Sequence, residues 1–218
     1  MTDYKHYFKG FMGGIIGILI SHPVDTYRVN YQTFNKIKFS QLYRGVLPPL
    51  LSVSIEKALV FGIFNNINDD NHFRNGLIAG TIASLLITPA DRIKIQLQTK
   101  SHKLSFNNIF RGFTPTLFRD GLGYALYFKI YNAFASKQDS PLDTFMKGGM
   151  TGSITWMFIY PFDYIKTNIQ NGSTYSDLIG YFYIHGLKSI YRGIGFALLR
   201  AFCMHGGVFM GYNYMNNV

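Results

Sequence analysis

One short motif, repeated three times at nearly even spacing, constrains this chain more than any other feature of its sequence. The motif reads Pro-x-Asp-x-x-(Arg/Lys), and its prolines Pro23, Pro89 and Pro161 stand 66 and 72 residues apart. Two glycines four residues apart precede each copy, and an aromatic-Arg-Gly sequence follows it. Three collinear copies of such a composite pattern indicate an internal repeat. The predicted repeats are residues 1–72, 73–142 and 143–218.

Each repeat also holds two long apolar stretches, one running into the proline motif and one following the Arg-Gly pair. A helix needs about 20 mostly apolar residues to span a bilayer, and lipid-facing backbone must form its hydrogen bonds internally. Every stretch carries Gly, Ser, Thr or a charge on one face, so six such helices would enclose an aqueous cavity. The expected fold is an all-α membrane protein with six transmembrane helices. The stretches are residues 7–34, 47–67, 73–98, 114–135, 143–170 and 194–214.

The composition agrees with this fold and excludes several other classes. Charged residues make up only 15% of the chain, against about 25% in ordinary soluble domains. Cys203 has no partner for a disulfide, and the six histidines lack metal-ligand spacing, so neither a metal nor a cofactor is expected. The net charge of +10 comes from basic residues scattered among apolar segments, which argues against nucleic-acid binding. No catalytic motif is present, so an enzyme is not expected.

The acid and the base of each proline motif stand three residues apart and share one face of a helix. Because a proline kinks each helix, three such helices can converge at one end of the cavity. Each acid can then pair with the base of the neighbouring helix, in a ring that closes the cavity when it forms. A glutamine nine residues after each proline would brace that ring. The alternative is that each copy is a local pair at the membrane surface. The ring residues are Asp25, Asp91, Asp163, Arg28, Lys94 and Lys166, with Gln32, Gln98 and Gln170 as braces.

The aromatic-Arg-Gly segments come directly before the second helix of each repeat. Free backbone N–H groups and the helix dipole attract anions at a helix start, and lipid phosphate is the expected anion. The alternative is that the arginines only extend to the membrane interface. The predicted lipid-binding residues are Arg44, Gly45, Arg111, Gly112, Arg192 and Gly193.

These motifs closely resemble the signature of the mitochondrial carrier family, over about residues 10–213. The resemblance implies six tilted helices with pseudo-threefold symmetry around a central cavity, which exchange a small charged solute by alternating access. It also implies a monomer in the mitochondrial inner membrane, bound to phospholipid such as cardiolipin, with both termini on the cytoplasmic side. The ring of ion pairs then corresponds to the family's matrix gate.

The chain departs from the family pattern in three ways. Short segments after the proline motif in repeats 1 and 2 leave room for the family's matrix helix only in repeat 3, at about Ser176–Ile184. The acids of the family's cytoplasmic network are replaced by Asn65, Asn132 and Asn213, which predicts a resting state biased toward opening to the cytoplasm. The abundance of Asn, Ile, Tyr and Phe is typical of an AT-rich genome, and it suggests a large DNA virus and a host mitochondrion.

By the same resemblance, the substrate contacts lie seven to eleven residues after each Arg-Gly glycine. Glu56 and Asp120 are suited to hold ammonium groups, while Arg119 or Arg200 is suited to bind a carboxylate. This set resembles that of carriers for basic amino acids. A nucleotide is the rival solute, with the two arginines on its phosphates and Tyr127 stacked on its base. Two more alternatives stay open. Either Arg119 pairs only with Asp120, or Glu56 only with Lys57, or a degenerate carrier acts as a receptor or scaffold.

Overall fold

The computed structural model describes residues 4–32, 42–43, 45–67, 69–98, 110, 112–136, 139–170, 173–191 and 194–215, with side chains except for residues 27–32, 90–98 and 187. Within these ranges the chain forms helices and no strand, which confirms the expected all-α class. The helices are α1 (Tyr4–Gln32), α2 (Leu47–Asn66), α3 (His72–Gln98), α4 (Phe113–Phe134), α5 (Pro141–Gln170), α6 (Tyr175–His185), the 3-10 helix η2 (Leu187–Tyr191) and α7 (Ile194–Tyr214).

Six of these helices correspond to the six predicted apolar stretches, and the motif prolines lie inside three of them. Pro23 falls within α1, Pro89 within α3 and Pro161 within α5. Among the described residues, α2 and α7 are long and apolar enough to count as candidate membrane spans by themselves. The other four long helices do not meet that criterion, as expected for helices that carry polar residues on one face.

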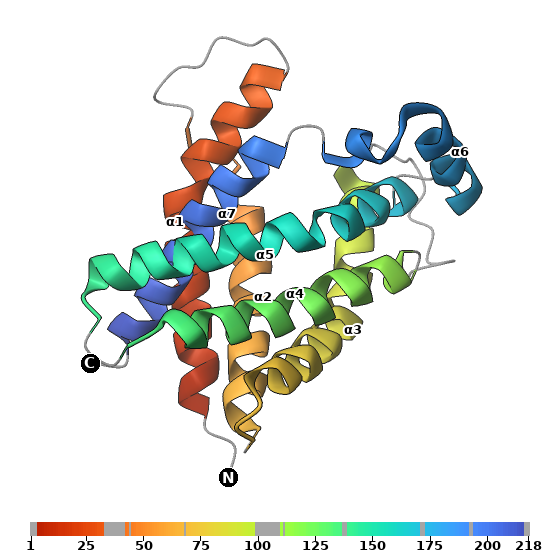
Figure 1. Ribbon diagram of the computed structural model, residues 1–218. Coiled ribbons are helices and arrows are strands. Elements are labelled where there is room, and N and C mark those ends of the chain that lie inside the picture. The colour runs from red at the N-terminus through yellow and green to blue at the C-terminus, as the bar shows by residue number, and fades with distance from the viewer. Residues whose placement is uncertain are drawn as a thin grey trace.

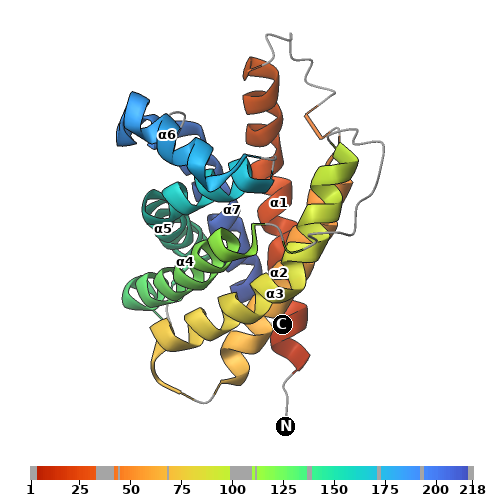
Figure 2. The ribbon, with the colours of Figure 1, turned by 90° about the vertical axis from the view of Figure 1, so that its right-hand side faces the viewer.

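The six long helices close a ring, which can be followed in Figures 1 and 2. Each packs against the next in chain order, from α1 through α5 to α7, and α7 packs back against α1. The most extensive contacts within this ring join α1 to α2, α3 to α4, and α5 to α7. These pairs correspond to the three predicted repeats, except that α3 begins at His72 and α5 at Pro141, one and two residues before the predicted boundaries. The boundaries themselves stay a prediction.

The paired glycines are the reason why the two helices of a repeat approach so closely. A Cβ atom added at Gly10 of α1 would lie 2.5 Å from the backbone oxygen of Lys57 in α2. One added at Gly76 of α3 would lie 2.5 Å from the backbone oxygen of Tyr124 in α4. In α5, one added at Gly148 would lie 3.0 Å from the backbone oxygen of His205 in α7, and one added at Gly152 would lie 2.5 Å from the His205 side chain. Small residues with this spacing are typical of tightly packed membrane helices.

The short helix α6 occupies the position predicted for a matrix helix in repeat 3. Its start is fixed by a capping box, in which the Thr174 hydroxyl accepts the backbone N–H of Asp177 and the Asp177 carboxylate accepts the backbone N–H of Thr174 at 2.8 Å. These hydrogen bonds hold the pKa of Asp177 below its usual range. The corresponding segments of repeats 1 and 2 fall largely outside the described residues.

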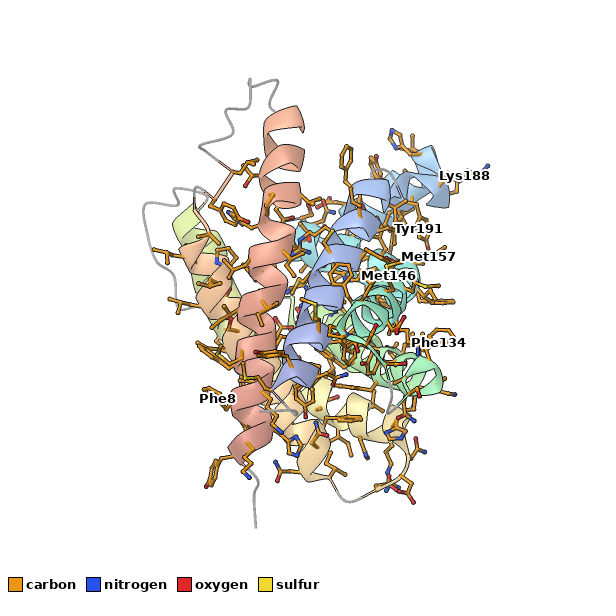
Figure 3. The ribbon with its side chains drawn as sticks, turned by 90° about the vertical axis from the view of Figure 1, so that its left-hand side faces the viewer. Phe8, Phe134, Met146, Met157, Lys188 and Tyr191 are labelled. Atoms are coloured by element: carbon orange, nitrogen blue, oxygen red, sulfur yellow. The ribbon has the colours of Figure 1, made fainter. Side chains whose placement is uncertain are left out.

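The outer surface of the ring carries many exposed large apolar side chains. Phe8 of α1, Phe134 of α4, and Met146 and Met157 of α5 lie on the outside of the bundle (Figure 3), and each is at least 45% exposed. A water-soluble protein of this size seldom exposes so much apolar surface. The exposed belt is the arrangement expected where lipid, not water, surrounds the helices.

Candidate functional site

A cavity of about 290 Å³ lies inside the ring, between α2, α4, α5 and α7. All five residues predicted from the sequence to contact a solute line it, although their role as contacts stays a prediction. Those residues are Glu56, Arg119, Asp120, Tyr127 and Arg200. We name the two ends of the ring by what lies there: α1 begins and α7 ends at the terminus end, and α6 lies at the loop end (Figure 1).

Toward the loop end, charged side chains from four helices form ion pairs. Arg119 of α4 is held by two acids, with Nε 2.6 Å from Oδ1 of Asp120 and Nη1 3.3 Å from Oδ1 of Asp163 in α5. Arg200 of α7 lies with its Nε 2.8 Å from Oδ1 of Asp25 in α1. We call these five residues the charged cluster. Both predicted contact arginines are therefore held by acids, and two of those acids belong to the predicted gate.

The predicted ring of acids and bases is described only in part. The side chains of Arg28, Gln32, Asp91, Lys94 and Gln98 lie outside the description. Of the remaining members, Lys166 and Gln170 are both buried in α5. Asp25 and Asp163 form ion pairs with the cavity arginines Arg200 and Arg119. The gate therefore stays a prediction. The sequence did not indicate that two of its acids also pair with the arginines predicted to contact the solute.

In the middle of the cavity, α2 and α4 share a short hydrogen-bonded chain. The buried Lys57 Nζ donates to the Tyr124 hydroxyl at 2.9 Å, and that hydroxyl donates to Oε1 of Glu56. Lys57 Nζ also lies 4.7 Å from the centre of the Tyr124 ring. Glu56 thus belongs to a network that links two repeats.

Sequence reasoning missed Lys57, Tyr124 and His205 as cavity residues. All three line the cavity, and each stands twelve residues after an Arg-Gly glycine. They are therefore equivalent positions in the three repeats. Extending the count from eleven residues to twelve would have found them.

Toward the terminus end, aromatic rings from α2, α4 and α7 pack together. Phe61 of α2 is central: its ring centre lies 5.1 Å from Phe128, 5.8 Å from Phe209 and 4.7 Å from Tyr212. Rings at these separations attract each other through their quadrupoles in addition to the area they bury. We call the set the aromatic cluster. Its members are Phe61, Phe64, Tyr127, Phe128, Tyr131, Phe209 and Tyr212.

The asparagines at the positions of the family's cytoplasmic acids lie around this cluster. Asn213 Nδ2 donates to the Tyr131 hydroxyl at 3.1 Å and so joins α7 to α4. Asn65 instead donates to the backbone oxygen of Phe61 in its own helix. The described residues provide aromatic packing at this end, together with the amide hydrogen bond from Asn213 and a hydrogen bond of 2.6 Å between His6 Nδ1 of α1 and the Tyr212 hydroxyl of α7.

The predicted lipid sites are seen only at two glycines. Gly45 and Gly112 have φ angles of 79° and 82°, in the left-handed region that favours glycine. Gly112 directly precedes α4, and only Val46 separates Gly45 from α2. The arginines of these segments and Gly193 lie outside the described residues, so lipid binding stays a prediction. Among the described residues no three His, Cys, Asp or Glu side chains are grouped as a metal site.

Comparison with known proteins gives consistent matches. The family model described as "Mitochondrial carrier protein" matches residues 71–108 and 137–218. A mitochondrial arginine transporter of Arabidopsis thaliana is 29% identical, over 95% of this chain and 89% of its own length. A mitochondrial carnitine carrier of Saccharomyces cerevisiae is 29% identical, over 96% of this chain and 86% of its own. A mitochondrial nicotinamide adenine dinucleotide transporter of Mus musculus is 27% identical, over 78% of this chain and 72% of its own length.

Proposed function

Because this chain belongs to the mitochondrial carrier family, we propose that the solute it carries is a small zwitterion of amino-acid type. Membership makes the protein a transporter, not an enzyme, and a multi-pass protein of the mitochondrial inner membrane. Six helices in three pseudo-threefold repeats would exchange the solute by alternating access, as a monomer bound to cardiolipin or a similar phospholipid.

The observation that carries this proposal is the balance of charge inside the cavity. Among the described residues, three acids and three bases line it, although the chain as a whole has a net charge of +10. A solute with one positive and one negative group can exchange contacts with both kinds of side chain. A polyphosphate would have to approach three carboxylates, which repel it. The acids are Glu56, Asp120 and Asp163, and the bases are Lys57, Arg119 and Arg200.

Two further observations support the same class. The cavity volume of about 290 Å³ is at the lower limit of known small-molecule sites, roughly 300–1,000 Å³, which suits a metabolite of amino-acid size. The arginine and carnitine named for two relatives each carry a carboxylate and a cationic group.

A nucleotide remains the rival solute because one relative is named for a dinucleotide. The rival needs an aromatic face for the base, and Tyr127 was the candidate. Tyr127 is buried, and its ring is stacked on Phe209 at 4.9 Å and packed against His205 at 4.7 Å between centres. A base would have to displace those rings before it could stack there.

Uptake of labelled solute into liposomes holding the purified protein tests the proposal. We expect saturable uptake of a basic amino acid and none of a nucleotide. The variant Glu56→Gln removes a negative charge but keeps an oxygen that can accept the Tyr124 hydroxyl, so amino-acid uptake should fall while nucleotide uptake does not. Asp70→Asn, an exposed acid between α2 and α3, is the matched control. Nucleotide uptake alone would establish the rival, and no uptake of either solute would favour a receptor or scaffold.

A further inference from the structure

Three buried polar atoms beside the cavity have no hydrogen-bond partner among the described residues. They are the Tyr127 hydroxyl of α4, the Thr155 hydroxyl of α5 and Nδ1 of His205 in α7. All three side chains line the cavity, and each is less than 10% exposed. Buried polar groups in proteins are nearly always hydrogen-bonded. Three unpaired ones on three helices around one cavity therefore point to a partner that the described residues do not supply.

The tautomer of His205 follows from its other ring nitrogen. Trp156 Nε1 lies 3.3 Å from His205 Nε2. An indole N–H can only donate a hydrogen bond, so His205 Nε2 accepts it and carries no proton. The neutral imidazole must then have its proton on Nδ1. The unpaired Nδ1–H is consequently a donor, and it requires an acceptor.

The neighbouring charges show which acceptor this group of donors favours. Lys57 Nζ lies 5.7 Å from the centre of the Tyr127 ring. A cation and three groups able to donate hydrogen bonds suit a carboxylate, which accepts several bonds and gains from the nearby positive charge. Of the three cavity acids, Asp120 and Asp163 lie toward the loop end, away from this group. Glu56 lies nearer, in the middle of the cavity, and accepts the Tyr124 hydroxyl.

We propose that Tyr127, Thr155 and His205 form a subsite for the carboxylate of the transported solute, whose cationic group lies against Asp163. The proposal rests on the proposed function and deepens it, because it fixes the direction in which the zwitterion lies. The carboxylate faces the aromatic cluster, and the cation faces the charged cluster.

Asp163 is the acid that can accept the solute's cation with the least disruption. Its contact with Arg119 is the longer of the two that Arg119 makes, at 3.3 Å against 2.6 Å to Asp120. When a solute cation replaces Arg119 at Asp163, Arg119 keeps its shorter ion pair. No buried charge is then left without a partner.

The distance between the two groups selects a class of amino acid. Thr155 and Asp163 stand eight residues apart on α5, which corresponds to about 12 Å along a helix axis at about 1.5 Å per residue. Side chains reaching toward each other shorten this gap. It nevertheless suits a solute with its cation at the far end of a carbon chain, such as arginine, lysine or ornithine, better than one whose two charges sit on adjacent groups.

Competition by a solute without a carboxylate tests the subsite. Labelled arginine is taken up into liposomes in the presence of unlabelled arginine or agmatine, which is arginine lacking its carboxylate. The parent protein should prefer arginine strongly. The double variant Tyr127→Phe, Thr155→Val removes two hydroxyl groups with little change of shape, and it should weaken arginine binding by more than about tenfold. Its affinity for agmatine should stay the same.

The outcomes separate the subsite from the function on which it rests. Tyr183→Phe, a hydroxyl deletion at a 93% exposed position of α6, controls for loss of a tyrosine hydroxyl elsewhere and should leave the preference for arginine unchanged. Arginine uptake with an undiminished preference in the double variant would overturn the subsite alone. Absence of uptake for arginine, lysine and ornithine in the parent would overturn the proposed function and the subsite with it.

Discussion

The two ends of the cavity are built from different kinds of side chain. The charged cluster at the loop end joins α1 to α7 and α4 to α5 through ion pairs, whereas the aromatic cluster at the terminus end joins α2, α4 and α7 through ring packing. An ion pair can be exchanged for the charges of a solute, because the solute offers the same kind of contact. Packed rings offer no such exchange. From this comparison we predict that the loop end responds to the solute and that the terminus end resists opening through packing.

This difference alters the argument about the missing cytoplasmic acids. The amides Asn65, Asn132 and Asn213 alone predict weak closure of that end and a resting state open to the cytoplasm. The aromatic cluster lies at the same end, and its ring contacts stabilise closure of that end in addition to any contacts of the three amides. The predicted bias stays a prediction, and aromatic packing acts against it.

The largest effect should come from the charged cluster. Arg119→Ala leaves the buried Asp120 without its 2.6 Å partner and also frees Asp163. Breaking a buried ion pair by removing one partner costs about 3–5 kcal/mol. We expect uptake into liposomes to fall to background at matched protein levels.

The control for this variant is another arginine in an ion pair. Arg74 lies 2.6 Å from Asp69, but its side chain is 62% exposed, and exposed pairs contribute only about 0–1 kcal/mol. Arg74→Ala should transport normally. Equal uptake by the Arg119→Ala and Arg74→Ala variants would contradict the special role given to the charged cluster.

The next effect concerns the centre of the aromatic cluster. Phe209→Ala removes a buried ring that contacts Phe61 and Tyr127, and such truncations cost about 3–5 kcal/mol in packed cores. The melting temperature of the purified protein should drop, and an introduced cavity cysteine should react faster from the terminus side. Phe8→Ala, at a 60% exposed position on the outside (Figure 3), should show neither change. Identical melting and labelling of the two variants would argue against closure by packing.

A smaller effect sharpens the comparison within the aromatic cluster. Tyr131→Phe keeps the ring but removes the hydroxyl that accepts from Asn213. One neutral hydrogen bond contributes about 1 kcal/mol, so the melting temperature should fall much less than in Phe209→Ala. A larger fall of the melting temperature in Tyr131→Phe than in Phe209→Ala would show that the amide hydrogen bond stabilises this end more than the ring packing does.

The smallest effect lies outside the cavity, at the start of α6. The pKa of Asp177 is lowered by its hydrogen bond to the backbone N–H of Thr174. A lowered pKa means stability that is present above the unfolded pKa, near 3.9, and is lost as pH falls through the folded pKa. Amide protection in α6, corrected for intrinsic exchange, should therefore decrease below about pH 4. Asp177→Asn keeps an oxygen that can accept the hydrogen bond, but its side chain does not titrate in this pH range. The same decrease of amide protection in that variant would show that another group causes it.

The sequence predicted the helices well, and the five residues it proposed as solute contacts all line the cavity, because both follow a fixed spacing. The proline motifs and glycine pairs recur at constant offsets, and helices of a repeat that share them must pack in the same way. Ion pairs between repeats were harder to predict. Asp25 and Arg200 are 175 residues apart in the sequence, and only the packing of α1 against α7, which closes the ring, brings them together.

The aromatic cluster could not be predicted for a different physical reason. In a membrane protein both the lipid-facing and the cavity-facing sides of a helix can be apolar, so Phe61 inside and Phe8 outside look alike in the sequence. Lys57 was missed because its charge suggested a local pair with Glu56, whereas burial directs it to Tyr124.

A thermal-shift titration of the purified parent protein tests most directly whether the cavity takes a zwitterion of amino-acid type. A solute that binds the folded state stabilises it by mass action, by about 2.7 kcal/mol at a hundred times its dissociation constant. We predict that arginine, lysine or ornithine raises the melting temperature in a saturable way and that nucleotides at the same concentration do not. Saturable stabilisation by a nucleotide, with none by the three amino acids, would contradict the account.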